Sequence, residues 1–120
     1  MFIILSLARN PHNQALLAAL LEPLGYRLLL TQSHHAFEQM LRHSPVVNFA
    51  LVDISGFDQQ VWNCCDRLRQ RRIIFFVLAP KSNPKISHTS SLHGASGCLG
   101  KPLNRQNLVQ LVQYHCLPKQ

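Results

Sequence analysis

The sequence has few acidic residues: five Asp and Glu stand against twelve Lys and Arg, which gives a formal net charge of +7. A surplus of this size suits a negatively charged partner such as nucleic acid, an acidic membrane surface or an acidic protein. The densest basic cluster holds Arg67, Arg69, Arg71 and Arg72. No aromatic residue interleaves with these arginines to stack on bases, and basic side chains are favoured at a helix C-terminus by the helix dipole. We therefore interpret the cluster as a helix end, ahead of a nucleic-acid patch.

Long apolar runs and paired metal-binding motifs are also missing. No stretch reaches the roughly 18 apolar residues that cross a bilayer, and the N-terminus lacks the basic segment and the cleavage site of a signal peptide. We therefore expect a cytoplasmic chain that does not enter a membrane. The four cysteines show no CxxC spacing, which predicts reduced thiols, and the scattered histidines predict no metal site.

Short apolar runs alternate with helical patterns along the chain. Runs typical of buried strands occupy residues 2–7, 26–31, 48–53, 73–78 and 98–100. Helices are predicted over residues 11–24, 34–43, 58–70 and 104–115. Residues 81–91 are rich in Ser, Thr, Asn and Pro, and the sequence leaves open whether they form a weak helix. The alternation predicts an α/β fold in one domain, residues 1–120, with a doubly wound, five-stranded parallel sheet of strand order 2-1-3-4-5.

The apolar run that ends at Asp53 is the centre of this pattern. A buried strand does not tolerate an acid in its middle, so Asp53 must lie where the strand leaves the sheet. The carboxyl ends of parallel strands form the edge at which ligands bind, which makes Asp53 the leading candidate for a site residue. The alternative is a turn or helix N-cap aspartate with no further role.

Three motifs then connect the chain to a known family. Leu51-Val52-Asp53 ends the third predicted strand, Leu24-Gly25-Tyr26 precedes the second strand, and the segment from Gly94 to Pro102 contains the fifth. Together they resemble the receiver domains of bacterial response regulators and hybrid sensor histidine kinases, which have a flavodoxin-like fold. The resemblance implies that Asp53 matches the phosphoacceptor aspartate, that Lys101 matches the lysine that reaches it, and that the peptide bond before Pro102 is cis.

Other positions depart from the receiver pattern. The family binds Mg²⁺ through two acids after the first strand, and the matching residues here are Ala8 and Arg9, so we expect no metal site and no cofactor. The hydroxyl residue that closes the fourth strand in the family matches Ala79, and the aromatic switch residue of the fifth strand matches Cys98.

Arg9 leaves two interpretations open. Its guanidinium could pair with Asp53 beside Lys101 and hold the carboxylate ionised without a metal, or it could point into solvent. The segment after Asp53 is shorter than the resemblance implies and lacks the expected proline, which predicts a loop of different shape over the site.

The resemblance and its departures favour a function without enzyme activity. The leading prediction is a pseudo-receiver of two-component signal transduction that takes up no phosphate and acts as a protein-interaction module, for example inside a hybrid sensor histidine kinase. Its partner would be a histidine kinase or another signalling domain, docked on the fourth helix, fifth strand and fifth helix through Leu92, Leu103 and Tyr114.

Two alternatives remain at the level of sequence. One is a competent receiver that accepts phosphate at Asp53 from a histidine kinase, with Mg²⁺ held by other oxygen ligands. The nearest acid, Asp58, has a simpler interpretation as a helix cap. The other is a basic nucleic-acid-binding module, for which the sequence contains no signature motif.

Overall fold

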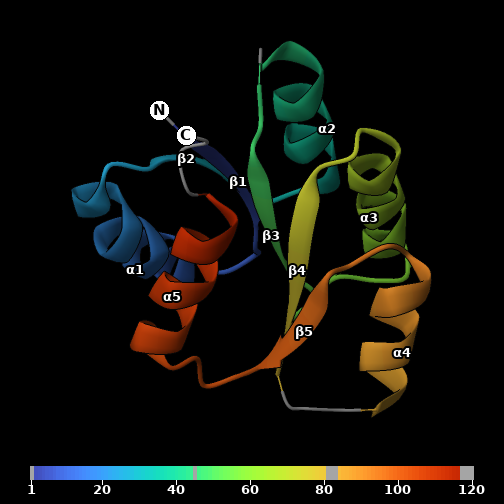
Figure 1. Cartoon of the computed structure of the whole chain (residues 1–120). Helices are drawn as coiled ribbons and strands as arrows, with labels where there is room; N and C mark the ends of the chain where they lie inside the picture. Colours follow the sequence, from blue (N-terminus) through green and yellow to red (C-terminus); the bar gives the residue numbers. More distant parts are fainter. Residues whose placement is uncertain (1, 45, 81–83, 117–120) are drawn as a thin grey trace.

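A single parallel sheet forms the middle layer of the structure, a computed structural model (Figure 1). The structure describes residues 2–44, 46–80 and 84–116. The strands are β1 (Ile3–Leu7), β2 (Arg27–Thr31), β3 (Phe49–Asp53), β4 (Ile74–Ala79) and β5 (Gly97–Gly100). All four strand pairings are parallel and the order is β2-β1-β3-β4-β5, which confirms the predicted fold class.

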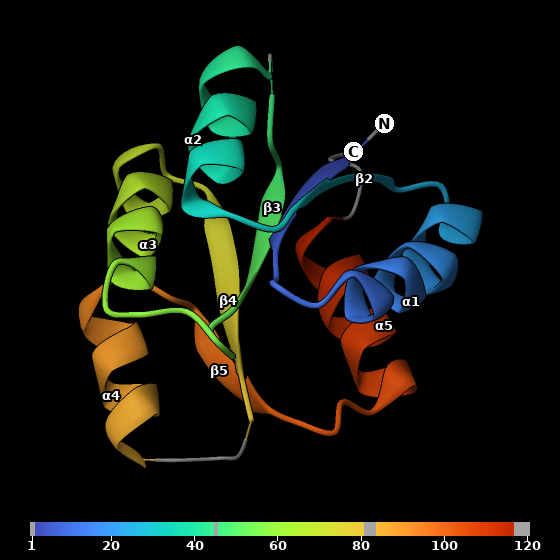
Figure 2. The same cartoon turned by 180° about the vertical axis from the view of Figure 1, so that it is seen from behind.

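Helices cover both faces of the sheet. One face carries α1 (Pro11–Leu21) and α5 (Arg105–His115), and the other carries α2 (His34–His43), α3 (Val61–Gln70) and α4 (Pro84–Leu92). The view from behind shows the same division (Figure 2). This arrangement is what right-handed crossovers between parallel strands produce. None of the helices in the described part of the chain is long and apolar enough to cross a membrane.

Two helix boundaries depart from the sequence pattern for local reasons. α1 ends at Leu21 and continues as a 3₁₀ turn, η1 (Glu22–Leu24), which Gly25 closes with a left-handed φ of 97°. α3 begins at Val61 because the carboxylate of Asp58 accepts a hydrogen bond from the backbone N–H of Gln60, at 2.9 Å, in a turn before the helix.

The segment that the sequence left open is helical from residue 84 to residue 92. Its hydroxyl side chains bond within the helix: Thr89 donates to the carbonyl of Lys85 at 2.9 Å, and Ser90 to that of Ile86 at 2.7 Å. These bonds satisfy the polar groups that made the segment resemble a loop. Residues 81–83 lie outside the described part of the chain.

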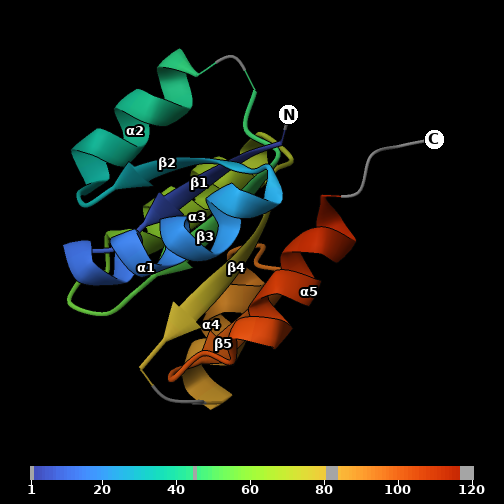
Figure 3. The same ribbon diagram turned by 90° about the vertical axis from the view of Figure 1, so that its left-hand side faces the viewer.

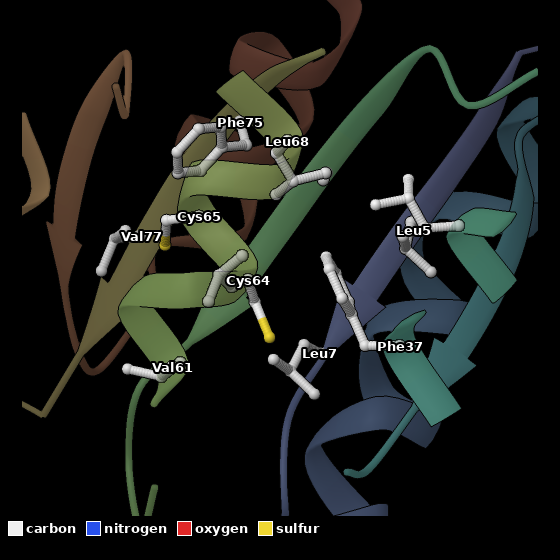
Figure 4. Packing of buried hydrophobic residues seen from close by; sticks show 12 residues of the cluster. Leu5, Leu7, Phe37, Val61, Cys64, Cys65, Leu68, Phe75 and Val77 are labelled. Carbon is white, nitrogen blue, oxygen red and sulfur yellow. The ribbon is translucent and has the colours of Figure 1, made fainter. Parts of the chain in front are cut away.

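The core is divided by the sheet into two apolar clusters, because alternate residues of each strand face opposite sides. The cluster under α2 and α3 is shown in Figure 4. There Cys64 points towards Phe37 and Leu7, whereas its neighbour Cys65 points towards Val77, so both thiols are buried. All four cysteines of the chain are free, as the sequence predicted.

Candidate functional site

Asp53 is the last residue of the central strand β3, and only 4% of its surface is exposed. One carboxylate oxygen, Oδ1, accepts a hydrogen bond from the backbone N–H of Ser55 at 3.0 Å. The other, Oδ2, accepts a hydrogen bond from the Nζ of Lys101. The acid therefore lies at the carboxyl edge of the sheet, with its charge balanced by a lysine.

Lys101 directly follows the edge strand β5, and its side chain reaches Asp53 from there. Its backbone N–H donates to the carbonyl of Ala79 at 2.9 Å, which extends the pairing of β4 and β5 by one step. The peptide bond to Pro102 is cis, as the resemblance implied. The ammonium also lies 3.2 Å from the hydroxyl of Ser55, so it joins two loops at this edge.

Ser55 is a site residue that sequence reasoning did not select. Its backbone binds one oxygen of Asp53 and its hydroxyl accepts from Lys101. The sequence signal was its position two residues after a strand-ending acid, where an aspartate side chain commonly bonds to the backbone.

Arg9 contacts the loop after β3 instead of Asp53. Its guanidinium donates a hydrogen bond to the carbonyl of Gly56 and lies 5.9 Å from the ring centroid of Phe57. The predicted pairing with Asp53 is thus wrong: the side chain is exposed, and it pairs with a loop carbonyl and an aromatic face. Gly56 has a φ of 79°, and a Cβ there would meet the Cδ of Arg9 at 3.1 Å, so this close contact suits glycine.

The residues at this edge do not fit Mg²⁺, the ion that the receiver resemblance implies. Magnesium requires oxygen ligands in near-octahedral geometry. The positions after β1 present a buried methyl group at Ala8 and an exposed cation at Arg9. Both oxygens of Asp53 are already bonded to protein donors. In the described part of the chain, no group of three or more His, Cys, Asp or Glu side chains is arranged to hold a metal ion.

The remaining predicted positions lie on β4, β5, α4 and α5 and in the segment before α5. Ala79 ends β4 and is fully buried, and Cys98 is half-buried on β5 against the core under α3. Leu92 and Tyr114 are well exposed, on α4 and α5 respectively, and Leu103 is half-buried. Edge strand β5 lies between α4 and α5, as Figure 1 shows.

A pocket of about 530 Å³ opens beside Asp53, between α1 and α5. Figure 3 shows these two helices on the same side of the sheet. Asp53, Lys101 and Arg105 are its charged lining residues, and most of the others are apolar. The sequence pattern did not predict this pocket, because it depends on the distance between two helices far apart in the chain.

Ser6 and Gln14, which line the pocket, form a buried polar cluster with Thr31. The Ser6 hydroxyl donates to the Oε1 of Gln14 at 2.7 Å, and the Gln14 amide donates to the carbonyl of Thr31 at 2.7 Å. The Thr31 hydroxyl donates to the Ser6 carbonyl at 2.7 Å. Gln14 is 3% exposed and thus occupies a core position of α1 that the leucine pattern did not indicate.

Similarity to known proteins appears only in three dimensions. No protein-family model matches the sequence, and no curated protein sequence matches it. A two-component response regulator from Clostridium difficile superposes with a TM-score of 0.88 at 18% identity, over 96% of this chain and 95% of that chain. The chain has the receiver fold.

Two further structures agree with this assignment of the fold. A response regulator from Thermotoga maritima gives a TM-score of 0.85 at 16% identity, over 96% of this chain and 97% of that one. A CheY-like receiver domain protein from Methanospirillum hungatei gives 0.84 at 18% identity, over 95% and 92%. At these identities the likeness concerns the fold, and the function must be argued from the side chains at the edge of the sheet.

Proposed function

We propose that residues 1–120 form one receiver-like domain of two-component signalling that has lost aspartyl phosphorylation. Such a pseudo-receiver acts in the cytoplasm as a protein-interaction module, with a histidine kinase or another signalling domain as its partner. The fold supports the signalling class, and the composition of the edge supports the loss of phosphorylation.

The state of Asp53 is the observation that carries the proposal. A phosphoryl group would add roughly two negative charges next to this carboxylate, and receivers offset that charge with a metal ion. Here the carboxylate is bonded to Lys101 and Ser55, and the positions that would ligate the metal hold Ala8 and Arg9. The donor hydroxyl at the end of β4 is replaced by the methyl group of Ala79. A single salt bridge thus remains of the phosphoacceptor site.

The test is an amide-shift titration of the ¹⁵N-labelled domain with Mg²⁺, followed by beryllofluoride as a mimic of aspartyl phosphate. We expect the amides of Asp53, Ser55 and Lys101 to stay in place at millimolar metal and after the mimic is added. Saturable shifts at these residues would instead establish a competent phosphoacceptor, the alternative function.

A gain-of-binding variant serves as the matched control. The double substitution Ala8→Asp, Arg9→Asp places two carboxylates after β1, next to Asp53. We expect millimolar Mg²⁺ to shift the amides around Asp53 in this variant but not in the wild type. The comparison shows that the titration can detect the metal in this fold.

A further inference from the structure

We propose that the pocket between α1 and α5 binds an amphipathic carboxylate, a small molecule with one anionic head and an apolar body. This inference goes beyond the signalling function, and it does not depend on whether Asp53 accepts phosphate. It rests on the chemistry of the pocket interior, the charges beside it and its volume.

The interior of the pocket favours a ligand with an apolar body. Leu17, Leu78 and Leu108 are buried lining residues, contributed by α1, β4 and α5. The buried uncharged polar residues of the wall, Ser6 and Gln14, are bonded to each other, and the other uncharged polar residue, Asn13, is exposed. Among the described residues, no buried side-chain nitrogen or oxygen lacks a hydrogen-bond partner. A polar ligand group would therefore find no unpaired partner in the interior, and its desolvation would oppose binding.

The charges that line the pocket favour an anionic head. Arg105, an exposed residue of the lining, forms no hydrogen bond or ion pair with any other described residue. Lys101 lines the same pocket but is bonded to Asp53, so these three charges sum to +1. α1 contributes no Asp, Glu, Lys or Arg to its wall. A carboxylate can accept two parallel hydrogen bonds from the free guanidinium of Arg105, whereas a cationic head would be repelled by it.

The volume suits a small molecule better than a protein segment. Small-molecule pockets occupy about 300–1,000 Å³, and 530 Å³ lies within that range. An α-helix is about 10 Å across with its side chains, so the same volume holds little more than one turn of a partner helix. A medium-chain carboxylate can place its whole apolar body inside.

The test is a series of amide-shift titrations of the whole chain with sodium hexanoate, octanoate and decanoate, each below its micelle concentration. We expect saturable shifts confined to residues around the pocket, such as Leu17, Leu20 and Leu108. The dissociation constant should fall about fourfold for each added CH₂ that is buried. Decanol should bind more weakly than decanoate, and decyltrimethylammonium more weakly still.

Two variants and one control connect the binding to the pocket. Arg105→Gln should raise the dissociation constant of decanoate about fivefold and leave that of decanol unchanged, because only the charged head loses its partner. Arg42→Gln removes one positive charge from an exposed position of α2, on the opposite face of the sheet. It should leave the affinities for decanoate and decanol unchanged. Leu20→Trp, at a half-buried position of the wall, should abolish binding of both ligands.

Three results would overturn the proposal. One is the absence of saturable shifts with decanoate, and another is equal decanoate affinity in the wild type and Arg105→Gln. The third is a set of shifts spread over the whole chain with no dependence on chain length, which indicates a detergent effect. Because Arg105 is exposed, its variant keeps the test decisive even where a substitution at Leu20 impairs folding.

Discussion

The ammonium of Lys101 is hydrogen-bonded to the carboxylate of Asp53, although 48 positions separate the two residues in the chain. Asp53 is almost fully buried at the end of β3, and the Lys101 side chain is 24% exposed in the segment after β5. The bond joins a central strand to the segment that follows an edge strand. Ala8 and Arg9 stand at the positions after β1, and the Lys101 ammonium balances the charge of the buried carboxylate.

Breaking this pair should cost stability. Lys101→Met leaves the buried carboxylate without its cation, and we expect a loss of about 2–3 kcal/mol in the free energy of unfolding. This lies below the range for fully buried pairs because water screens Lys101 in part. The effect is measured by urea unfolding of Lys101→Met. Arg42→Gln serves as a surface control, and a double variant combines Asp53→Asn with Lys101→Met. The double variant should recover part of the loss, and a loss for Lys101→Met no larger than for Arg42→Gln would contradict the prediction.

The buried side chain of Gln14 should also contribute to stability. Gln14→Ala leaves the buried hydroxyl of Ser6 without its acceptor and opens a cavity, so we expect a loss of about 2–3 kcal/mol by urea unfolding. Asn13→Ala, on the exposed side of the same helix, should stay within about 0.5 kcal/mol of the wild type. Removing both polar partners with Ser6→Ala, Gln14→Leu should cost less than Gln14→Ala alone. A larger loss in the double variant would show that the bond is not the source of the effect.

Asp66 should hold the end of α4 against α3. Its carboxylate lies 2.7 Å from the Nδ1 of His93 and 3.6 Å from the guanidinium of Arg69, which also donates to the carbonyl of Leu92 at 3.2 Å. We expect Asp66→Asn to raise amide hydrogen exchange in α4 by up to about fivefold, since partly exposed ion pairs contribute at most about 1 kcal/mol. The matched control is Glu38→Gln, which breaks a pair with Arg67 on the α2 side and should leave α4 unchanged. Equal exchange in both variants would argue against this role.

The two buried thiols should make the fold sensitive to alkaline pH. Burial raises the pKa of Cys64 and Cys65 to about 12 from an ordinary value of 9.0, and the nearby charge of Glu38 adds to the shift at Cys64. The folded state keeps both thiols protonated, whereas the unfolded chain loses these protons above pH 9. Their contribution is therefore complete below pH 9 and is lost as the pH rises towards 12.

The expected size follows from proton linkage. Each thiol should lower the free energy of unfolding by about 1.4 kcal/mol per pH unit between those limits. Urea unfolding at pH 8 and pH 10.5 measures the slope, and Cys64→Ala, Cys65→Ala supplies the control because it removes both groups. An equal slope in the two proteins would disprove the assignment.

The order of elements could be predicted because it rests on local patterns. Apolar runs of three to six residues indicated five strands, and their alternation with helical patterns indicated a parallel sheet. The helix over residues 84–92 was left open because its Ser and Thr residues favour turns in isolation. Hydrogen bonds to carbonyls one turn earlier satisfy these side chains, and that depends on the helix having formed.

The site was predictable in part. Asp53 was selected because it ends its strand, and Lys101 because of the resemblance to receiver domains; the structure brings the two together. The contact of Arg9 with Gly56 and Phe57 was not predictable, because it depends on the path of a loop after another strand. The same holds for the burial of Gln14, whose partners belong to β1 and β2.

The sequence by itself determined which residues form strands and helices and which acid ends the central strand. Hydrophobic periodicity and the residues that end strands and helices act locally. Only the tertiary structure decided that Lys101 and Ser55 occupy both oxygens of that acid, that Arg9 pairs with a loop, and that a pocket opens between α1 and α5. These features depend on distances between segments far apart in the chain. Packing of the whole sheet and its helices sets those distances, and no local pattern encodes them.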